Sequence, residues 1–188
     1  MSDVIVLARG GILQAADVVS IAAAADLDLA AAATLLIKES SGGRNVWGHD
    51  DVVVAPHTYT KGGLVTESNY TAYIAAVKAG RAGRQGCGPT QLTFGPFQQR
   101  ADDLGGCWRF EINCRVGFEI LADHIRTRGV QDGFRAYNGS GPRAGRASGF
   151  ASQPDRVQVL GQDPVDSPFE LVERVMLGVD VAARERVE

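Results

Sequence analysis

The chain is 188 residues long and carries 19 basic and 22 acidic side chains, which gives a formal net charge of −3. This length suits one domain that buries its own core, and we expect a single domain over residues 1–188 with its core at about 14–150. The weak negative charge gives no electrostatic support for binding nucleic acid or an anionic membrane surface. The chain has no run of about 18 uninterrupted apolar residues, so we expect no membrane insertion. The expected oligomeric state is a monomer.

In chain order, the first helical pattern covers residues 17–25 and can be capped by Asp17. The second covers residues 28–39, with Asp28 as the expected cap and a Gly-Gly pair after it as the stop signal. Residues 46–59 are irregular, apart from three consecutive valines at 52–54 that predict a short strand or hairpin arm. A third helix is predicted over 68–79.

Residues 80–96 are rich in glycine and predict a long loop, after which Pro96 takes a first helical position in a helix ending near Gly105. The longest periodic segment, 110–128, predicts the central helix of the core. Gly117 lies inside this segment and costs stability unless another helix packs against it. Shorter patterns predict helices at 132–137 and at about 168–186.

The three cysteines are Cys87, Cys107 and Cys114, and none has a metal-ligand spacing such as C-x-x-C. At most one disulfide can form within the chain. Six residues lie between Cys107 and Cys114, so a disulfide can clamp the start of the central helix, and buried thiols are the alternative.

Glu39 follows the apolar residues Leu36 and Ile37 at the C-terminal end of the second helix. The helix dipole and poor solvation both disfavour the carboxylate there, so we expect a raised pKa. A carboxylic acid that keeps its proton near neutral pH is what a glycosidase needs to protonate the leaving oxygen of a sugar. The alternative interpretation is a solvated glutamate in the last turn of an ordinary helix.

Five short strings occur in order over about residues 28–141: ESSGG, WGHD, GCGPTQLT, INCRVGFEIL and AYNGSG. Together they resemble the goose-type lysozyme and soluble lytic transglycosylase group, and more closely the lysozyme-like domains of actinobacteriophage endolysins. The resemblance implies a mainly α (α+β) lysozyme-like fold with a central helix and a small irregular or β region. It implies no metal and no organic cofactor.

The resemblance also implies roles for the residues around Glu39. Glu39 takes the part of the general acid, and Ser40 follows it as the motif requires, as a substrate-binding residue. The WGHD string places Asp50 where the goose-type enzymes have an aspartate that positions the attacking water, with one histidine inserted. Asp51 is an alternative for the same role.

Two further strings supply the implied substrate contacts. The loop string GCGPTQL matches the family's sugar-lining loop at Gly88 and Gln91, and Gln91 is expected to bond an acetamido or hydroxyl group. Thr93 stands where goose-type enzymes have a second aspartate. The A-Y-N string places Tyr137 beside the acid, which it steadies, and gives Asn138 a contact with substrate.

Residues 52–85 have no counterpart in the short family pattern and are expected to form an insertion that makes one wall of the cleft. Tyr59, Tyr70 and Tyr73 lie in it. They can stack on sugar rings, or they can pack the insertion onto the core, and for Tyr73 the second interpretation is at least as well founded because it lies on an apolar helix face.

The implied function is cleavage of the β-1,4 bond between N-acetylmuramic acid and N-acetylglucosamine in bacterial peptidoglycan. Attack by water gives hydrolysis, and attack by the sugar's own 6-hydroxyl gives the anhydro product of a lytic transglycosylase. A non-catalytic peptidoglycan-binding or phage structural module and a chitin-cleaving enzyme remain alternatives. Residues 1–6 contain an acid and no basic residue, so no secretory signal is expected, and an endolysin made in the host cytoplasm would reach the cell wall through a membrane pore.

Overall fold

The computed structural model describes residues 2–48, 52–54, 57–59 and 62–139, with the backbone alone for 52–54 and 57–59. The described residues contain seven helices and one two-stranded sheet, so the expectation of a mainly α protein is confirmed. The elements are α1 (Asp3–Arg9), α2 (Ala15–Ala24), α3 (Leu29–Ser40), β1 (Val52–Val54), β2 (His57–Tyr59), α4 (Glu67–Lys78), α5 (Gly95–Asp103), α6 (Phe110–Arg128) and α7 (Val130–Tyr137).

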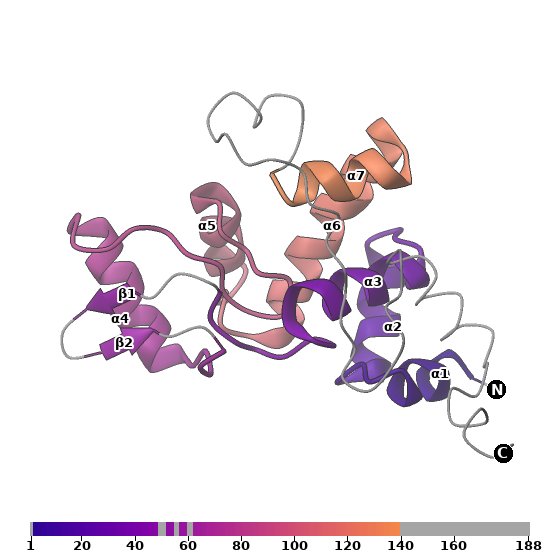
Figure 1. Cartoon of the computed structure of the whole chain (residues 1–188), viewed down its shortest axis with the longest axis horizontal. Helices are drawn as coiled ribbons and strands as arrows, with labels where there is room; N and C mark the ends of the chain where they lie inside the picture. The colour runs from indigo at the N-terminus through magenta and orange to yellow at the C-terminus, as the bar shows by residue number, and fades with distance from the viewer. Residues whose placement is uncertain (1, 49–51, 55–56, 60–61, 140–188) are drawn as a thin grey trace, which may run out of the picture.

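Helix α6 is central, as its periodicity predicted. Figure 1 shows α1, α2 and α3 at one end of the molecule, β1, β2 and α4 at the other, and α5 and α6 between them. Two clusters of buried residues meet at α6, because Phe118 and Leu121 belong to the cluster with α1–α3 while Val116 and Ile120 belong to the cluster with α4 and α5. This helix is therefore buried on more than one face.

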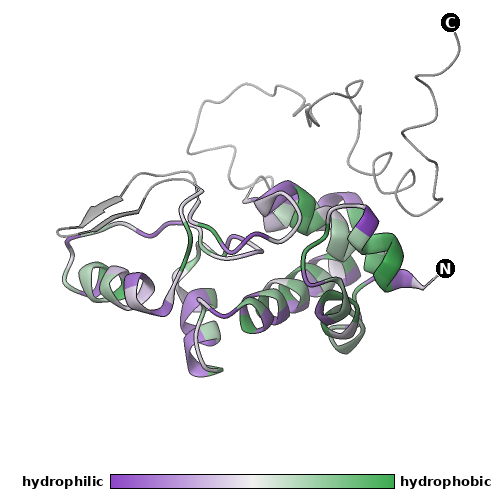
Figure 2. Cartoon of the chain, turned by 90° about the horizontal axis from the view of Figure 1, so that it is seen from below, coloured by the Kyte–Doolittle hydropathy of each residue, from purple (hydrophilic) through white to green (hydrophobic). Residues whose placement is uncertain are grey.

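Sequence signals explain where three of the described helices begin. Asp28 caps α3, since its carboxylate accepts from the backbone N–H groups of Ala30 and Ala31 at 2.9 and 3.2 Å. Pro96 lies in the first turn of α5, as predicted. Helix α4 begins at a capping box that pairs Thr66 with Asn69. In Figure 2 the described helices carry both hydrophobic and hydrophilic residues, as expected of helices with one buried face.

Some boundaries differ from the prediction. Helix α2 begins at Ala15, so Asp17 lies in its first turn and is not the cap. Helix α1 was not predicted, because its only buried residue is Leu7 and so short a segment gives little periodic signal. The valine run 52–54 is one arm of an antiparallel hairpin whose other arm is 57–59, with Val53 opposite Thr58. The helix predicted at 168–186 lies outside the described residues.

Two of the three tyrosines named in the predicted insertion, Tyr70 and Tyr73, are core residues and not sugar-stacking platforms. Tyr70 and Tyr73 are 2% and 0% exposed, so stacking of their rings on a saccharide is ruled out in this conformation. Both pack on Trp47, with ring centroids 6.3 and 5.1 Å from it. The packing interpretation is confirmed for these two tyrosines, and the side chain of Tyr59 lies outside the described residues.

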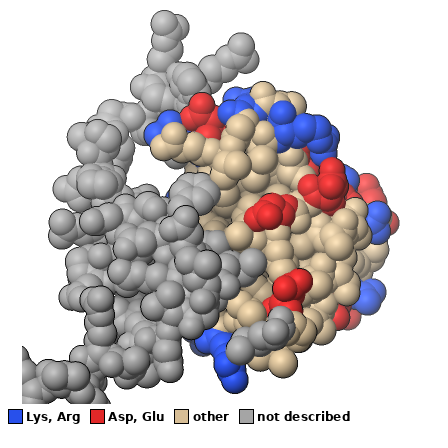
Figure 3. Space-filling model, turned by 90° about the vertical axis from the view of Figure 1, so that its right-hand side faces the viewer, with Lys and Arg blue, Asp and Glu red and all other residues tan. Residues whose placement is uncertain are grey.

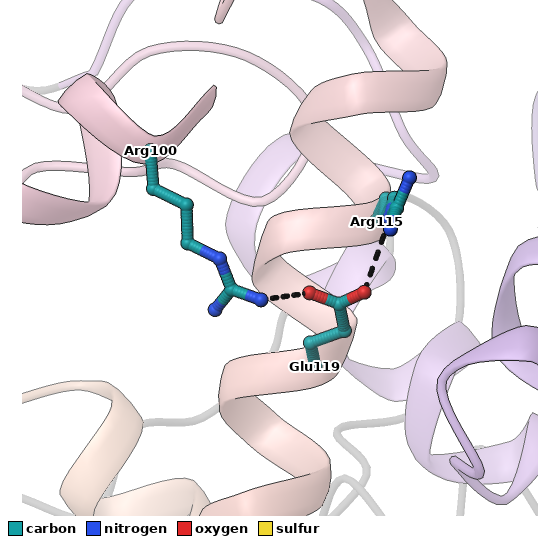
Figure 4. A network of polar contacts seen from close by, with 3 residues as sticks. All are labelled: Arg100, Arg115 and Glu119. Carbon is teal, nitrogen blue, oxygen red and sulfur yellow. Dashed lines mark hydrogen bonds and ion pairs between the residues drawn. The ribbon is translucent and has the colours of Figure 1, made fainter. Parts of the chain in front are cut away.

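Charged side chains are distributed over the surface. On the side drawn in Figure 3, acidic residues lie within a largely uncharged area, and basic residues lie mostly toward its upper and right-hand edges. Glu119 of α6 accepts hydrogen bonds from Arg115, at 3.1 Å, and from Arg100 of α5, which ties α5 to α6 (Figure 4). Among the described helices, none combines the length and the apolar character that crossing a membrane requires.

Candidate functional site

Glu39 lies in the last turn of α3 and is partly buried. Burial raises the pKa of its carboxyl group above the ordinary value, and the positive charge of the neighbouring Lys38 opposes this only in part. The direction of the shift agrees with the sequence-based prediction. A carboxyl group in this environment keeps its proton to a higher pH than a solvated glutamate does.

Ser40 joins α3 to a loop that lies far away in sequence. Its hydroxyl donates to the backbone carbonyl of Pro89 at 2.6 Å and accepts from the N–H of Gly43 at 3.1 Å. The residue is 5% exposed. In the structure Ser40 therefore fastens the loop beside Glu39, and its predicted contact with substrate stays a prediction that this burial does not favour.

The loop 86–93 is a tight turn held from both sides. Cys87 and Leu92 exchange backbone hydrogen bonds of 3.3 and 3.1 Å, which closes the turn, and Gly88 donates to the carbonyl of Val46 at 3.0 Å. Gln91 has a left-handed backbone, with φ at 53°. Its side-chain amide donates to the carbonyls of Val46 and Gly88 at 2.9 and 2.8 Å, so both of its N–H groups shape the loop and leave its oxygen as the group for a ligand.

Thr90, inside this loop, is bonded to the buried residue Asn113 of α6. The side-chain oxygen of Asn113 accepts from the Thr90 backbone N–H at 3.0 Å and from its hydroxyl at 2.9 Å. The Asn113 amide donates to the carbonyls of Cys87 and Cys107 at 3.0 and 3.2 Å. One fully buried side chain thus satisfies polar groups from two loops, as buried polar groups require.

Two glycines make room for this arrangement. A Cβ atom at Gly88 would lie 2.2 Å from the amide of Asn113, and one at Gly117 would lie 2.3 Å from the hydroxyl of Thr90. Gly117 was predicted to cost stability unless another helix packs against it, and the group that packs there is not a helix. The partner is the loop residue Thr90, which fits directly against the backbone of α6.

Tyr137, the last residue of α7, completes the site. Its hydroxyl donates to the carbonyl of Thr90 at 2.7 Å, and its ring packs against both buried clusters. Burial raises the pKa of Tyr137, and the negative charge of Glu39 is among the smaller causes, which places the two groups within electrostatic reach of one another. Asn138 follows at the C-terminal end of α7 and is exposed.

The structure therefore brings Glu39 and Tyr137 together. The loop that carries Gly88 and Gln91 lies between α3, α6 and α7. Asp50 and Asp51 lie outside the described residues, so their predicted roles stay predictions. Thr93 is exposed, and its hydroxyl donates to the carbonyl of Gln91 at 3.2 Å. In the described part of the chain, no group of three or more His, Cys, Asp or Glu side chains is arranged to hold a metal ion.

Sequence reasoning missed Thr90 and Asn113 as the residues that hold the site together. Both lie in strings that carry the resemblance, but a buried polar network leaves no periodic pattern in a sequence. The one available signal was Gly117, because a glycine inside a strong helix pattern indicates close approach of another backbone or side chain.

The three cysteines are free and buried. The alternative of buried thiols is therefore the one observed, and no disulfide joins Cys107 to Cys114. Cys107 instead lies against Cys87, with the two sulfur atoms 3.3 Å apart.

Comparison with known proteins gave no relatives. No protein-family model matches the chain, and neither a curated protein nor a solved structure is detectably similar to it.

Proposed function

We propose that this protein is a lysozyme-like glycosidase that cleaves the β-1,4 bond between N-acetylmuramic acid and N-acetylglucosamine in bacterial peptidoglycan. The observation that carries the proposal is the position of Glu39, a partly buried glutamate whose burial raises its pKa at the end of α3. The five strings in family order support the lysozyme-like fold and the substrate. No metal or organic cofactor is part of the proposed reaction.

In the proposed reaction, protonated Glu39 donates its proton to the glycosidic oxygen as the bond to the anomeric carbon breaks. Positive charge then develops on the anomeric carbon, and the carboxylate left on Glu39 lies near it. Tyr137 and Ser40 act on this step by position, because both are hydrogen-bonded to the loop that packs beside the acid. Gln91 offers its amide oxygen to a donor on the sugar.

Two acceptors complete the reaction in different ways. Water directed by Asp50 gives hydrolysis, which we favour because WGHD resembles the goose-type arrangement. Attack by the 6-hydroxyl of the muramic acid residue gives an anhydro end and needs no second carboxylate. Thr93 supports this alternative, since it replaces the second goose-type aspartate and its hydroxyl is bonded to the loop.

The experiment is mass spectrometry of the fragments released from purified peptidoglycan by the wild-type protein, Glu39→Gln and Glu111→Gln. Glu111 is an exposed glutamate in the first turn of α6, so its change to glutamine is a matched control. We expect fragments from the wild type and from Glu111→Gln and none from Glu39→Gln. Hydrated ends identify a hydrolase, and ends lighter by one water identify a transglycosylase.

Other outcomes contradict the proposal. Release of fragments by Glu39→Gln at the wild-type rate would remove Glu39 from the chemistry. Binding to peptidoglycan without release by any of the three proteins would favour a non-catalytic wall-binding or phage structural module. Release of sugars from chitin but not from peptidoglycan would show that chitin, and not peptidoglycan, is the substrate.

Action at the cell wall after passage through a membrane pore is part of the same proposal.

A further inference from the structure

Two cysteine sulfurs face each other in the core behind the site. The Sγ atoms of Cys87 and Cys107 are 3.3 Å apart, and both residues are 0% exposed. They come from different loops, because Cys87 lies in the turn 86–93 and Cys107 lies between α5 and α6. The third cysteine, Cys114, belongs to the other buried cluster, on the side of α6 that faces α1–α3.

Neighbouring groups hold both cysteines in place. The backbone of Cys87 is paired with Leu92, and the N–H of Cys107 donates to the carboxylate of Asp102 at 3.1 Å. The side-chain amide of Gln98 approaches the sulfur of Cys87 at 3.7 Å, and that of Asn113 approaches the sulfur of Cys107 at 3.4 Å. The facing arrangement of the thiols is thus supported by the backbone and by buried amides on both sides.

We propose that Cys87 and Cys107 are a modification site that forms a disulfide when the protein meets an oxidant. A disulfide has its sulfurs about 2.0 Å apart, so the two atoms need only a small approach from their present contact. Cys114 takes no part, because its thiol lies in the other cluster. This inference does not rest on the proposed function.

The oxidant we name is a low-molecular-weight dialkyl disulfide, such as oxidised glutathione. The thiolate of one cysteine attacks the reagent, forms a mixed disulfide and releases one small thiolate, which takes up the proton that the cysteine lost. The second cysteine then attacks the protein sulfur of the mixed disulfide and releases the other small thiol. Two protein thiols are oxidised, and one reagent disulfide is reduced to two thiols.

Burial makes this reaction slow in the folded protein. The hydrogen bond with Cys107 and burial both raise the pKa of Cys87, which keeps its thiol protonated and poorly nucleophilic. Formation during folding, when every thiol is accessible, avoids this barrier. The new bond closes the chain from Cys87 to Cys107 around α5 and fixes the turn that carries Thr90 and Gln91 to the start of α6.

The test is refolding of the full, reduced and denatured chain in a buffer of reduced and oxidised glutathione, followed by denaturation, alkylation of the remaining thiols and peptide mapping. Of the three cysteines, we expect one alkylated thiol, on Cys114, and one linked peptide that joins Cys87 to Cys107. The same oxidation of the chain kept in denaturant is the control, and it should give all three pairings.

The matched variant is Cys114→Ala, which should still form the linked peptide and leave no free thiol. Reduction with dithiothreitol should restore the thiols of the wild type and of this variant. Three alkylated thiols in the refolded wild type would overturn the proposal. So would a refolded product in which Cys114 pairs as often as it does in denaturant.

Discussion

Replacing Asn113 by alanine tests whether one buried amide holds the site loop to α6. The change removes the acceptor of the Thr90 backbone N–H and the donor to the Cys107 carbonyl, and the structure gives neither group a second partner among the described residues. A buried polar group left without a partner costs about 1–3 kcal/mol, so two such groups cost about 4 kcal/mol. This is a large part of the roughly 5–15 kcal/mol that stabilises a domain.

The assay is urea-induced unfolding of the wild type, Asn113→Ala and Asn69→Ala, followed by circular dichroism. Asn69 is the matched control, because it also loses side-chain hydrogen bonds, but at an exposed capping box of α4. Loss of such a cap costs about 1 kcal/mol. If Asn113→Ala lowers the free energy of unfolding by no more than Asn69→Ala does, the buried network does not hold the loop and the reasoning fails.

Further predictions concern the other residues around the loop. Gly117→Ala should lower the free energy of unfolding by about 2 kcal/mol, although alanine is normally the better helix former, because its Cβ meets Thr90; a higher melting temperature would contradict this. The folded-state pKa of Glu39 is raised, so its contribution to stability is complete below the unfolded pKa and is lost as pH rises through the folded pKa. Glu39→Gln should therefore match the wild type in stability at pH 4 and exceed it at pH 7.5 in urea titrations, and equal stability at both pH values would refute the shift. Tyr137→Phe should lose about 1 kcal/mol with its hydrogen bond to Thr90, measured by the same titration, and an unchanged midpoint would show that the bond is not important.

The helices were predictable where local chemistry decides them. Asp28 caps α3, Pro96 lies in the first turn of α5, and the periodic segment 110–128 has the bounds of α6. The prediction was poorer where tertiary contacts decide. For Tyr70 and Tyr73 both a cleft wall and a core position stayed open, with the core position at least as well founded for Tyr73, because the sequence does not say which face of α4 meets Trp47.

The site was predictable in part, for the same reason. The raised pKa of Glu39 was predictable, because this glutamate stands at the end of an apolar helix, and burial raises its pKa as expected. The hydrogen bonds of Ser40 and Gln91 were not predictable, because each goes to a backbone carbonyl that only folding brings close. Ser40 bonds the carbonyl of Pro89, and Gln91 bonds that of Val46. The hydroxyl of Ser40 and the side-chain N–H groups of Gln91 bond the backbone of the protein, and the side-chain oxygen of Gln91 is left for a ligand.

The long-range hydrogen bonds of the site determine when it can form during protein synthesis. Ser40 bonds a residue 49 positions later in the chain, and Tyr137 bonds one 47 positions earlier. Contacts between such distant positions form slowly, since a long loop must close before they form. A growing chain is made from its N-terminus, so Glu39 is made long before the loop 86–93 and Tyr137. The hydrogen bond from Tyr137 to Thr90 cannot form until the ribosome has passed Tyr137, so the surroundings of Glu39 stay incomplete until the last described helix has been made.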